Sequence, residues 1–334
     1  MINPPYNASA DRYDGDMTFE RCGRSGVMLP RISLGMWHNF GDVNTLANSR
    51  DMLHYAFDHG VTCFDLANNY GPSFGSAEET FGLVMERSFK PYRDEMIITT
   101  KAGWDMWPGP YGNWGSRKYL IASLNQSLQR MKLDYVDIFY SHRFDPMTPM
   151  EETLQALVDV VRQGKALYVG ISQWPKEASQ FAYDYLAARD VPCLIYQGRY
   201  NMIDRNKAHE GILSQAAENG VGFTAFSPLE QGILTDRYLQ GIPRDSRAAR
   251  DKTLKADTIT PTLVEKLKQL NDLAQQRAQS LTQMSLAWLL KDSMVASVIV
   301  GCSSVPQLAN SLGCLNNTTF TREELDAIDR ILQI

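Results

Sequence analysis

The sequence has few cysteines and no motif that pairs them. Its 334 residues include 5 cysteines, which are widely scattered and form no C-x-x-C pair. This pattern is typical of reduced thiols in a cytosolic protein. The 5 histidines show neither H-x-x-H nor H-E-x-x-H spacing, which argues against a metal site built on such motifs. We therefore predict a cytoplasmic protein with no metal centre.

Long hydrophobic runs and blocks of positive charge are also missing. No apolar run approaches the ~18 residues that a membrane-spanning helix needs, and the N-terminal stretch lacks the parts of a secretory signal. The chain carries 33 Lys and Arg against 38 Asp and Glu, a net charge of −5. With no basic cluster, nucleic acid and anionic membranes are poor partners, and we expect a small-molecule substrate.

Short apolar runs alternate with amphipathic stretches of helical period. They are rich in β-branched and aromatic residues, as in strands buried on both faces of a parallel sheet. The eight runs are Ile32–Leu34, Val61–Phe64, Met96–Thr99, Tyr135–Tyr140, Leu167–Ile171, Cys193–Tyr196, Gly222–Phe226 and Val298–Val300. This order predicts an α/β fold, a (β/α)8 TIM barrel. An open doubly wound sheet is the alternative. However, the nearest glycine fingerprint, at 220–225, follows a helix and leads into a strand, so we interpret it as a helix C-cap.

Several signals mark where helices and loops begin. Capping boxes are predicted at Ser76–Glu79 and Thr148–Glu151, and further helix starts are predicted at Ser116, Thr260-Pro261 and Thr321–Glu324. Residues 17–31 are expected to form a β-hairpin. We expect a single domain over residues 1–334, with 1–16 as an N-terminal tail and the irregular segment 228–260 as a functional loop.

Chemically active side chains follow three successive predicted strands. Asp65 and Tyr70 follow the second run, Lys101 the third, and His142 the fourth, positions that line the catalytic face of a barrel. We expect Lys101 to lower the pKa of Tyr70, and Asp65 to keep Lys101 protonated. Tyr70 would then be the general acid toward a carbonyl group. A neutral His142 would orient the carbonyl oxygen, and the partner reagent would be a hydride.

Two other interpretations of these residues stay open at this point. The Asp–Lys pair could be purely structural. A barrel lyase could instead use Lys101 to form a Schiff base with its substrate.

These residues lie in motifs that resemble the aldo-keto reductase family from residue 17 to Ser311. The motifs are Gly60-Val-Thr-Cys-Phe-Asp65-Leu-Ala-Asn-Asn-Tyr70-Gly, Lys101, Tyr140-Ser-His142, Val169-Gly-Ile-Ser172, Gln197-Gly-Arg-Tyr-Asn201, Phe226-Ser-Pro-Leu229 and Gly301-Cys-Ser303. Segments 37–40, 107–112 and 116–119 are similar to the branch with the bacterial L-glyceraldehyde 3-phosphate reductases and the potassium-channel β-subunits. The resemblance implies NADPH-dependent reduction of aldehydes or ketones to alcohols. The implied substrates are small or phosphorylated aldehydes such as L-glyceraldehyde 3-phosphate and methylglyoxal.

The resemblance also implies site residues. Asp65, Tyr70, Lys101 and His142 match the catalytic tetrad. The NADP(H) site would have Ser172 and Gln197 at the nicotinamide carboxamide and Phe226 against the ring. Positions at the phosphates and the adenosine are Ser227, Leu229, Gly232, Arg237, Arg247, Gly301, Ser303 and Gln307. Taken alone, Phe226 could instead be part of the barrel core, and Arg237 and Arg247 could be solvated surface charges. Ser304, Asn310 and Ser311 depart from the family pattern, so NADH is the alternative coenzyme.

The substrate side is assigned to aromatic and basic residues in loops. Trp37 and Trp107 would shape a pocket, with loop packing as the alternative; Trp104, Trp114 and Trp174 are expected at the same rim. Arg143 would bind a substrate phosphate, with an ion pair to Asp145 or Asp137 as the alternative. The related branch implies a homo-oligomer, and it leaves a second function open, a regulatory subunit that senses NADP(H) with little turnover.

Overall fold

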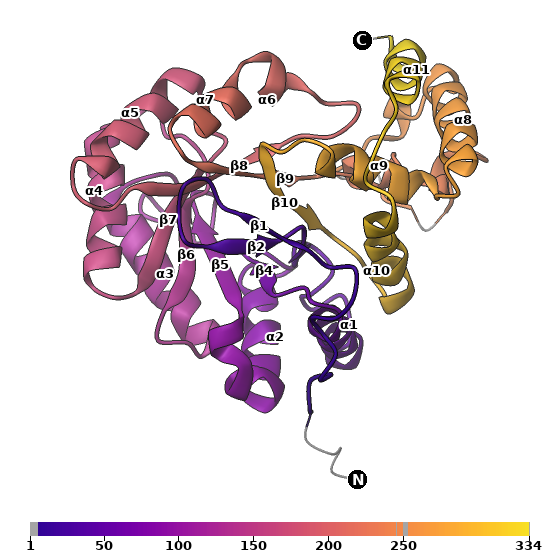
Figure 1. Cartoon of the computed structure of the whole chain (residues 1–334). Helices are drawn as coiled ribbons and strands as arrows, with labels where there is room; N and C mark the ends of the chain where they lie inside the picture. Colours follow the sequence, from indigo (N-terminus) through magenta and orange to yellow (C-terminus); the bar gives the residue numbers. More distant parts are fainter. Residues whose placement is uncertain (1–5, 245, 250–252, 334) are drawn as a thin grey trace.

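Eight parallel strands close into a barrel in the computed structural model, which describes residues 6–244, 246–249 and 253–333 (Figure 1). The strands are β3 (Ile32–Gly35), β4 (Cys63–Asp65), β5 (Ile97–Ala102), β6 (Val136–Ser141), β7 (Ala166–Ser172), β8 (Cys193–Arg199), β9 (Gly222–Phe226) and β10 (Val295–Val300). They pair in chain order, and β10 pairs with β3 to complete the ring. The predicted (β/α)8 barrel is confirmed, and the open sheet is excluded. Residues 1–5 of the expected tail, and 245 and 250–252 of the expected loop, lie outside the described residues.

An antiparallel hairpin of β1 (Phe19–Arg21) and β2 (Met28–Pro30) precedes the barrel, as predicted. Its buried residues Cys22 and Leu29 pack with Cys63 and Leu194, which lie at or next to the first residues of β4 and β8. The hairpin therefore covers the end of the barrel where the strands begin. The opposite end, where the strands finish, is left for the site.

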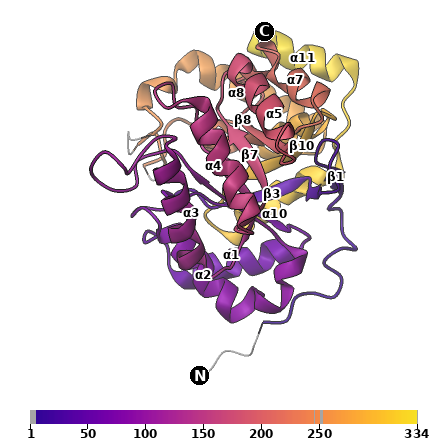
Figure 2. The same ribbon diagram turned by 90° about the vertical axis from the view of Figure 1, so that its left-hand side faces the viewer.

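Helices surround the barrel, and α2 to α5 lie side by side on its outside in both views (Figures 1 and 2). The α-helices are α1 (Leu46–Asp58), α2 (Ser76–Val84), α3 (Arg117–Met131), α4 (Met150–Arg162), α5 (Lys176–Ala187), α6 (Asn206–His209), α7 (Ile212–Glu218), α8 (Pro261–Gln276), α9 (Leu281–Leu290), α10 (Val305–Leu312) and α11 (Arg322–Leu332). A π-helical turn (Met85–Phe89) and 3₁₀ turns (Lys90–Glu95, Glu230–Gly232, Asp236–Tyr238, Ala256–Thr258, Gly313–Asn316) complete them. In the described part of the chain, no helix has the length and apolar character to cross a bilayer.

All five predicted helix starts are confirmed to within one residue, but the capping boxes predicted at Ser76 and Thr148 are wrong. Ser116, Thr260 and Thr321 each accept a backbone N–H bond in the first turn. Ser76 is the first residue of α2, after Gly75 at the cap position, and its hydroxyl donates to the Ser73 carbonyl. The Thr148 hydroxyl donates to Asp145, and Pro149 takes the cap position of α4. Because Gly75 and Pro149 occupy the cap positions, neither hydroxyl makes the side-chain hydrogen bond of a capping box.

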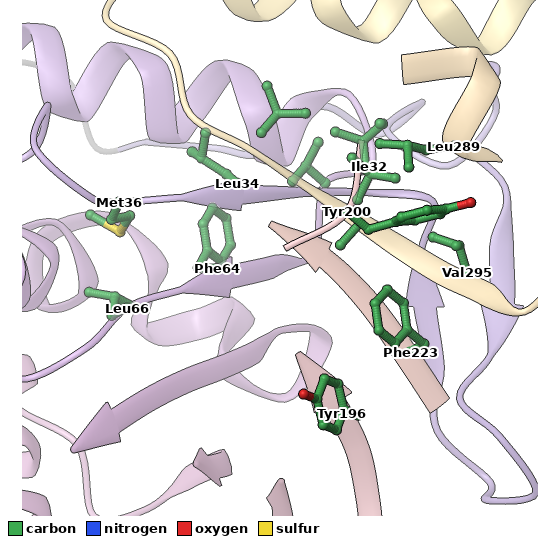
Figure 3. Packing of buried hydrophobic residues seen from close by; sticks show 14 of the residues in the cluster. Ile32, Leu34, Met36, Phe64, Leu66, Tyr196, Tyr200, Phe223, Leu289 and Val295 are labelled. Carbon is green, nitrogen blue, oxygen red and sulfur yellow. The ribbon is translucent and has the colours of Figure 1, made fainter. Parts of the chain in front are cut away.

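The core lies between the strands and the helices (Figure 3). Leu34 and Phe64 come from β3 and β4, and Tyr196 and Phe223 come from β8 and β9; the last two rings stack with centroids 5.8 Å apart. Inside the barrel, a Cβ at Gly170 would lie 2.6 Å from the Tyr140 ring. Only glycine leaves room there for the tyrosine.

The start of the described chain is docked rather than extended from the barrel. Tyr6 stacks on His54 of α1 with ring centroids 3.8 Å apart, and its hydroxyl donates to Asp58. Arg12 pairs with Glu95 at 2.7 Å. These contacts fix the N-terminal segment against the outer layer, away from the open end of the barrel.

Candidate active site

Three neighbouring strands bring charged and aromatic groups to the open end of the barrel. Asp65 is the last residue of β4, Lys101 lies near the end of β5, and His142 directly follows β6. Tyr70 lies in the loop after β4. Because β4, β5 and β6 are adjacent and parallel, their ends meet at one rim, and the four predicted residues lie together.

The Lys101 ammonium group is the centre of this cluster. Its Nζ donates to Asp65 Oδ2 and to the Leu66 carbonyl, each at 2.7 Å, and lies 3.4 Å from the Tyr70 hydroxyl. The side chain has no exposed surface. Burial lowers the pKa of Lys101, whereas the charge and hydrogen bond of Asp65 act in the opposite direction. The carboxylate is thus what retains a cation at this depth.

The Asp65 carboxylate is held from its other side as well. Its Oδ1 accepts from the Thr99 hydroxyl at 2.8 Å and from the Gln197 amide at 2.9 Å. With Oδ1 occupied by two donors, Oδ2 faces Lys101. The orientation of the ion pair is therefore fixed by β5 and β8.

The Tyr70 phenol has a pKa well above its ordinary value, because it is buried and because the Asp65 charge opposes a phenolate. The expectation that Lys101 would lower this pKa is therefore wrong for the structure described. The loss of hydration and the negative charge of Asp65 both act against the phenolate. Tyr70 stays protonated, which is the form that can donate.

The His142 ring lies edge-on to Tyr70, with centroids 5.9 Å apart and an interplanar angle of 71°. Burial, reinforced by the positive charges of Lys101 and Arg143, lowers the pKa of His142 well below its usual range. The imidazole is therefore neutral at physiological pH. Its Nδ1 is buried and has no hydrogen-bond partner among the described residues, so the ring retains polar capacity for a ligand.

A cleft of about 670 Å³ opens beside this cluster. Asp65 and Tyr70 line it, with Trp37 from the loop after β3. Nine of the residues that were predicted to hold a coenzyme also line it: Phe226, Ser227, Leu229, Gly232, Arg237, Arg247, Gly301, Ser303 and Gln307. Ser172, the last residue of β7, and Gln197, two residues before the end of β8, are both buried and paired in register.

The polar character of the cleft suits an extended anionic ligand. Arg237 and Arg247 supply positive charge on its wall. Ser303 and Gln307 lie on either side of the first residue of α10, and Gln307 accepts from the Ser303 N–H at 2.9 Å. A helix start of this kind favours phosphate oxygens.

The residues predicted for the substrate side are only partly brought together. Trp37 lines the cleft, but Trp107 does not; it packs on Tyr119 with centroids 5.1 Å apart. Trp174 is 1% exposed, and its indole N–H donates to Ser141, so it belongs to the core rather than to the rim.

Arg143 does not form the ion pairs that were considered for it. Asp137 pairs with Arg93 at 2.9 Å, and Asp145 accepts from the Gly115 N–H and the Thr148 hydroxyl. Instead, the Arg143 guanidinium group lies between Trp104 and Trp114, 3.9 and 3.5 Å from the ring centroids.

Nearly the whole chain is similar to proteins of one known family. Residues 31–333 match the Aldo/keto reductase family. The chain belongs to the aldo/keto reductase family. A curated "L-glyceraldehyde 3-phosphate reductase" of Escherichia coli (strain K12) is 54% identical over 327 residues, which cover 97% of this chain and 94% of the relative. A "Probable voltage-gated potassium channel subunit beta" of Arabidopsis thaliana is 33% identical, covering 95% and 97%.

A solved structure is similar over nearly the whole fold. The crystal structure of a thermostable aldo-keto reductase in complex with the inhibitor epalrestat has a TM-score of 0.74 at 26% identity. The match covers 94% of this reductase and 100% of that chain. As an aldo/keto reductase, the protein is an oxidoreductase that acts on carbonyl groups and uses a nicotinamide coenzyme.

Several residues that shape the reductase site were not found by sequence reasoning. Thr99 donates a hydrogen bond to Asp65. Side chains two residues apart on a strand point to the same face. The alternation of the strand could therefore have placed Thr99 beside Lys101. Asn113 contacts Arg143, and Thr235 and Tyr238 line the cleft. These last three lie in loops or single turns, where no periodic pattern marks a residue.

Proposed function

We propose that this reductase converts aldehydes and ketones to alcohols, with Tyr70 as the proton donor. The observation that supports this most directly is the contact chain from Asp65 through Lys101 to the Tyr70 hydroxyl, at 2.7 and 3.4 Å. When bound, the reduced nicotinamide coenzyme would supply the hydride. The remaining chemistry is the transfer of one proton to the carbonyl oxygen.

The Tyr70 O–H bond breaks as a new O–H bond forms on the substrate oxygen. The phenolate that remains lies beside the Lys101 ammonium group, whose attraction offsets the burial that otherwise disfavours the anion. Asp65 retains the charge on Lys101. The neutral His142 would orient the carbonyl oxygen from the other side, using the polar capacity of its ring.

The coenzyme that the cleft fits best is NADP(H). Ser172 and Gln197 would hold the carboxamide and Phe226 the nicotinamide ring, while the loop 227–247 and the start of α10 would hold the phosphates and the adenosine. We propose NADPH over NADH because Arg237 and Arg247 bring two cations to the wall of this cleft. Tighter binding of NADH than of NADPH would contradict that preference.

The substrates that we propose are small or phosphorylated aldehydes, such as L-glyceraldehyde 3-phosphate and methylglyoxal. The support is the 54% identity to the Escherichia coli reductase that is named for the first of these. We also propose that the chain is one barrel domain over 1–334, with 228–260 as the coenzyme loop, and that it is cytoplasmic, since its five buried cysteines are free thiols. We further propose a homo-oligomer, as the branch that the sequence resembles implies.

Tyr70→Phe tests the proton-donor role, because it removes one hydroxyl and leaves the ring. We expect the kcat for an aldehyde to fall by about 10²- to 10⁴-fold, while the Kd for NADPH, measured by fluorescence titration, stays within a few-fold. Tyr55→Phe on the outer helix α1 is the matched control and should retain activity. Turnover of Tyr70→Phe near the wild-type rate would refute the proposal.

A second function, a sensor subunit, follows from the similarity to the potassium-channel subunit. It is distinguished by turnover. Tight NADPH binding with negligible consumption of a panel of small aldehydes would favour the sensor, whereas steady consumption favours the enzyme.

A further inference from the structure

The Arg143 guanidinium group is enclosed on both faces. Trp104 covers one face and Trp114 the other, at 3.9 and 3.5 Å from Cζ to the ring centroids. Both indoles are themselves about two-fifths exposed. Since water cannot approach the planar faces, the cation can be reached only at its edge.

Two hydrogen bonds fix the plane of this edge. Arg143 Nε donates to the Gly103 carbonyl at 2.7 Å, and Nη2 donates to Asn113 Oδ1 at 2.8 Å. The remaining nitrogen, Nη1, has no partner among the described residues. The guanidinium group is thus held in one orientation, with donors still available on one side.

The nearby carboxylates do not neutralise this cation. Asp105 accepts from the Asn113 amide, and Asp145 accepts from the Gly115 N–H and from Thr148. Both exert an attraction on Arg143 from a distance, but neither forms an ion pair with it among the described residues. Buried charges in proteins are usually paired, and Arg143, although partly buried, has no carboxylate partner among the described residues.

Arg143 lies about one short substrate length from the place where His142 would hold the carbonyl group. The Trp104 ring contacts Arg143 and also lies edge-on to His142, with centroids 6.4 Å apart. The guanidinium carbon is therefore within about 10 Å of the His142 ring. A chain of four bonds of about 1.5 Å spans roughly 5 Å, and a hydrogen bond of about 3 Å at each end closes the gap.

We propose that Trp104, Trp114, Asn113 and Arg143 form an anion clamp that binds a phosphate or carboxylate group at the far end of a short aldehyde. The inference rests on the proposed function and deepens it, because it assigns specificity to the orienting residues Asn113 and Trp114 as well as to the cation. A planar guanidinium edge matches two oxygens of such a group, whereas a hydroxyl end offers a single weak acceptor.

The test uses two pairs of substrates, and the two members of each pair have the same carbon skeleton. The phosphate pair is glyceraldehyde 3-phosphate and glyceraldehyde, and the carboxylate pair is succinic semialdehyde and butanal. In Arg143→Met we expect the ratio of kcat/KM for the anionic over the neutral aldehyde to fall about 10- to 100-fold, as for a lost hydrogen bond to a charged group. Asn113→Ala and Trp114→Leu should lower the same ratio by about 3- to 10-fold through KM. Arg322→Ala, which removes an exposed charge on α11, is the control.

Equal losses on the anionic and neutral substrates would overturn the clamp, because they would show a structural role beside His142. If a variant fails to fold, competition is measured in the wild type. Inorganic phosphate should then inhibit competitively against glyceraldehyde 3-phosphate. The absence of such inhibition would overturn the proposal. Failure of the proposed function would look different, since the wild type would then reduce neither neutral nor anionic aldehydes with NADPH.

Discussion

Replacing Asp65 by asparagine would leave Lys101 inside the barrel without its carboxylate. The Lys101 side chain has no exposed surface, and the Asp65 side chain is 4% exposed. Removing one partner of such a pair costs about 3–5 kcal/mol of the free energy of unfolding. A second route gives a similar figure. A lysine with an ordinary pKa of 10.5 that must enter the fold uncharged costs about 4 kcal/mol at pH 7.5, at 1.36 kcal/mol per pH unit.

The loss should depend on pH in a definite direction. Burial depresses the folded-state pKa of Lys101, and Asp65 acts against that effect. Without Asp65 the pKa falls further, so the unfolded chain binds more protons than the folded one, and stability rises with pH. As the pH rises, the difference in the free energy of unfolding between the wild type and Asp65→Asn should therefore decrease by up to about 1.4 kcal/mol per pH unit. It stops narrowing where Lys101 of the wild type also loses its proton.

Urea unfolding from pH 7.5 to 9.5 measures this gap. The double variant Asp65→Asn/Lys101→Met serves as the control, because it has no ammonium group to bury and should show no such slope relative to Lys101→Met. A gap that stays constant over this range, or a slope that survives in the double variant, would refute the assignment of the cost to Lys101.

Two further predictions concern the site and the packing. Because the pKa of His142 lies well below its usual range, we expect kcat/KM for a neutral aldehyde to show no inflection near pH 6.5; an acid limb there would contradict a neutral imidazole. Gly82→Ala should destabilise the fold by about 1–3 kcal/mol, since its Cβ would lie 2.1 Å from the Arg130 carbonyl oxygen. Thermal unfolding checks this against Gly26→Ala, whose Cβ would meet nothing within 4 Å.

The strands and the catalytic cluster could be predicted because both depend on local patterns. All six residues of β6 are buried, so its apolar run is readable without any tertiary knowledge. Asp65 ends its strand, Lys101 lies one residue before the end of its strand, and His142 follows its strand; parallel strands of a closed barrel must finish at one rim. Chain order was then enough to place them side by side.

The state of these groups could not be predicted in the same way. Burial and the charge of Asp65 both raise the pKa of Tyr70, whereas sequence reasoning weighed only the attraction of Lys101. The capping boxes at Ser76 and Thr148 failed because each helix begins one residue away from its predicted start, with Gly75 and Pro149 at the cap positions. The surroundings of Arg143 come from an irregular loop, where no spacing rule relates Trp104 to Trp114.

The proposed proton-transfer groups come from the first half of the ring, β4 to β6, whereas most of the cleft wall comes from residues 226–311. The Gln197–Asp65 hydrogen bond joins the two halves. In the proposed mechanism, the groups that would supply the proton and most of those that would hold the coenzyme therefore lie on separate stretches of chain. A chimera that takes segment 226–311 from a relative with another coenzyme preference should acquire that coenzyme preference and retain Tyr70 as the proton donor.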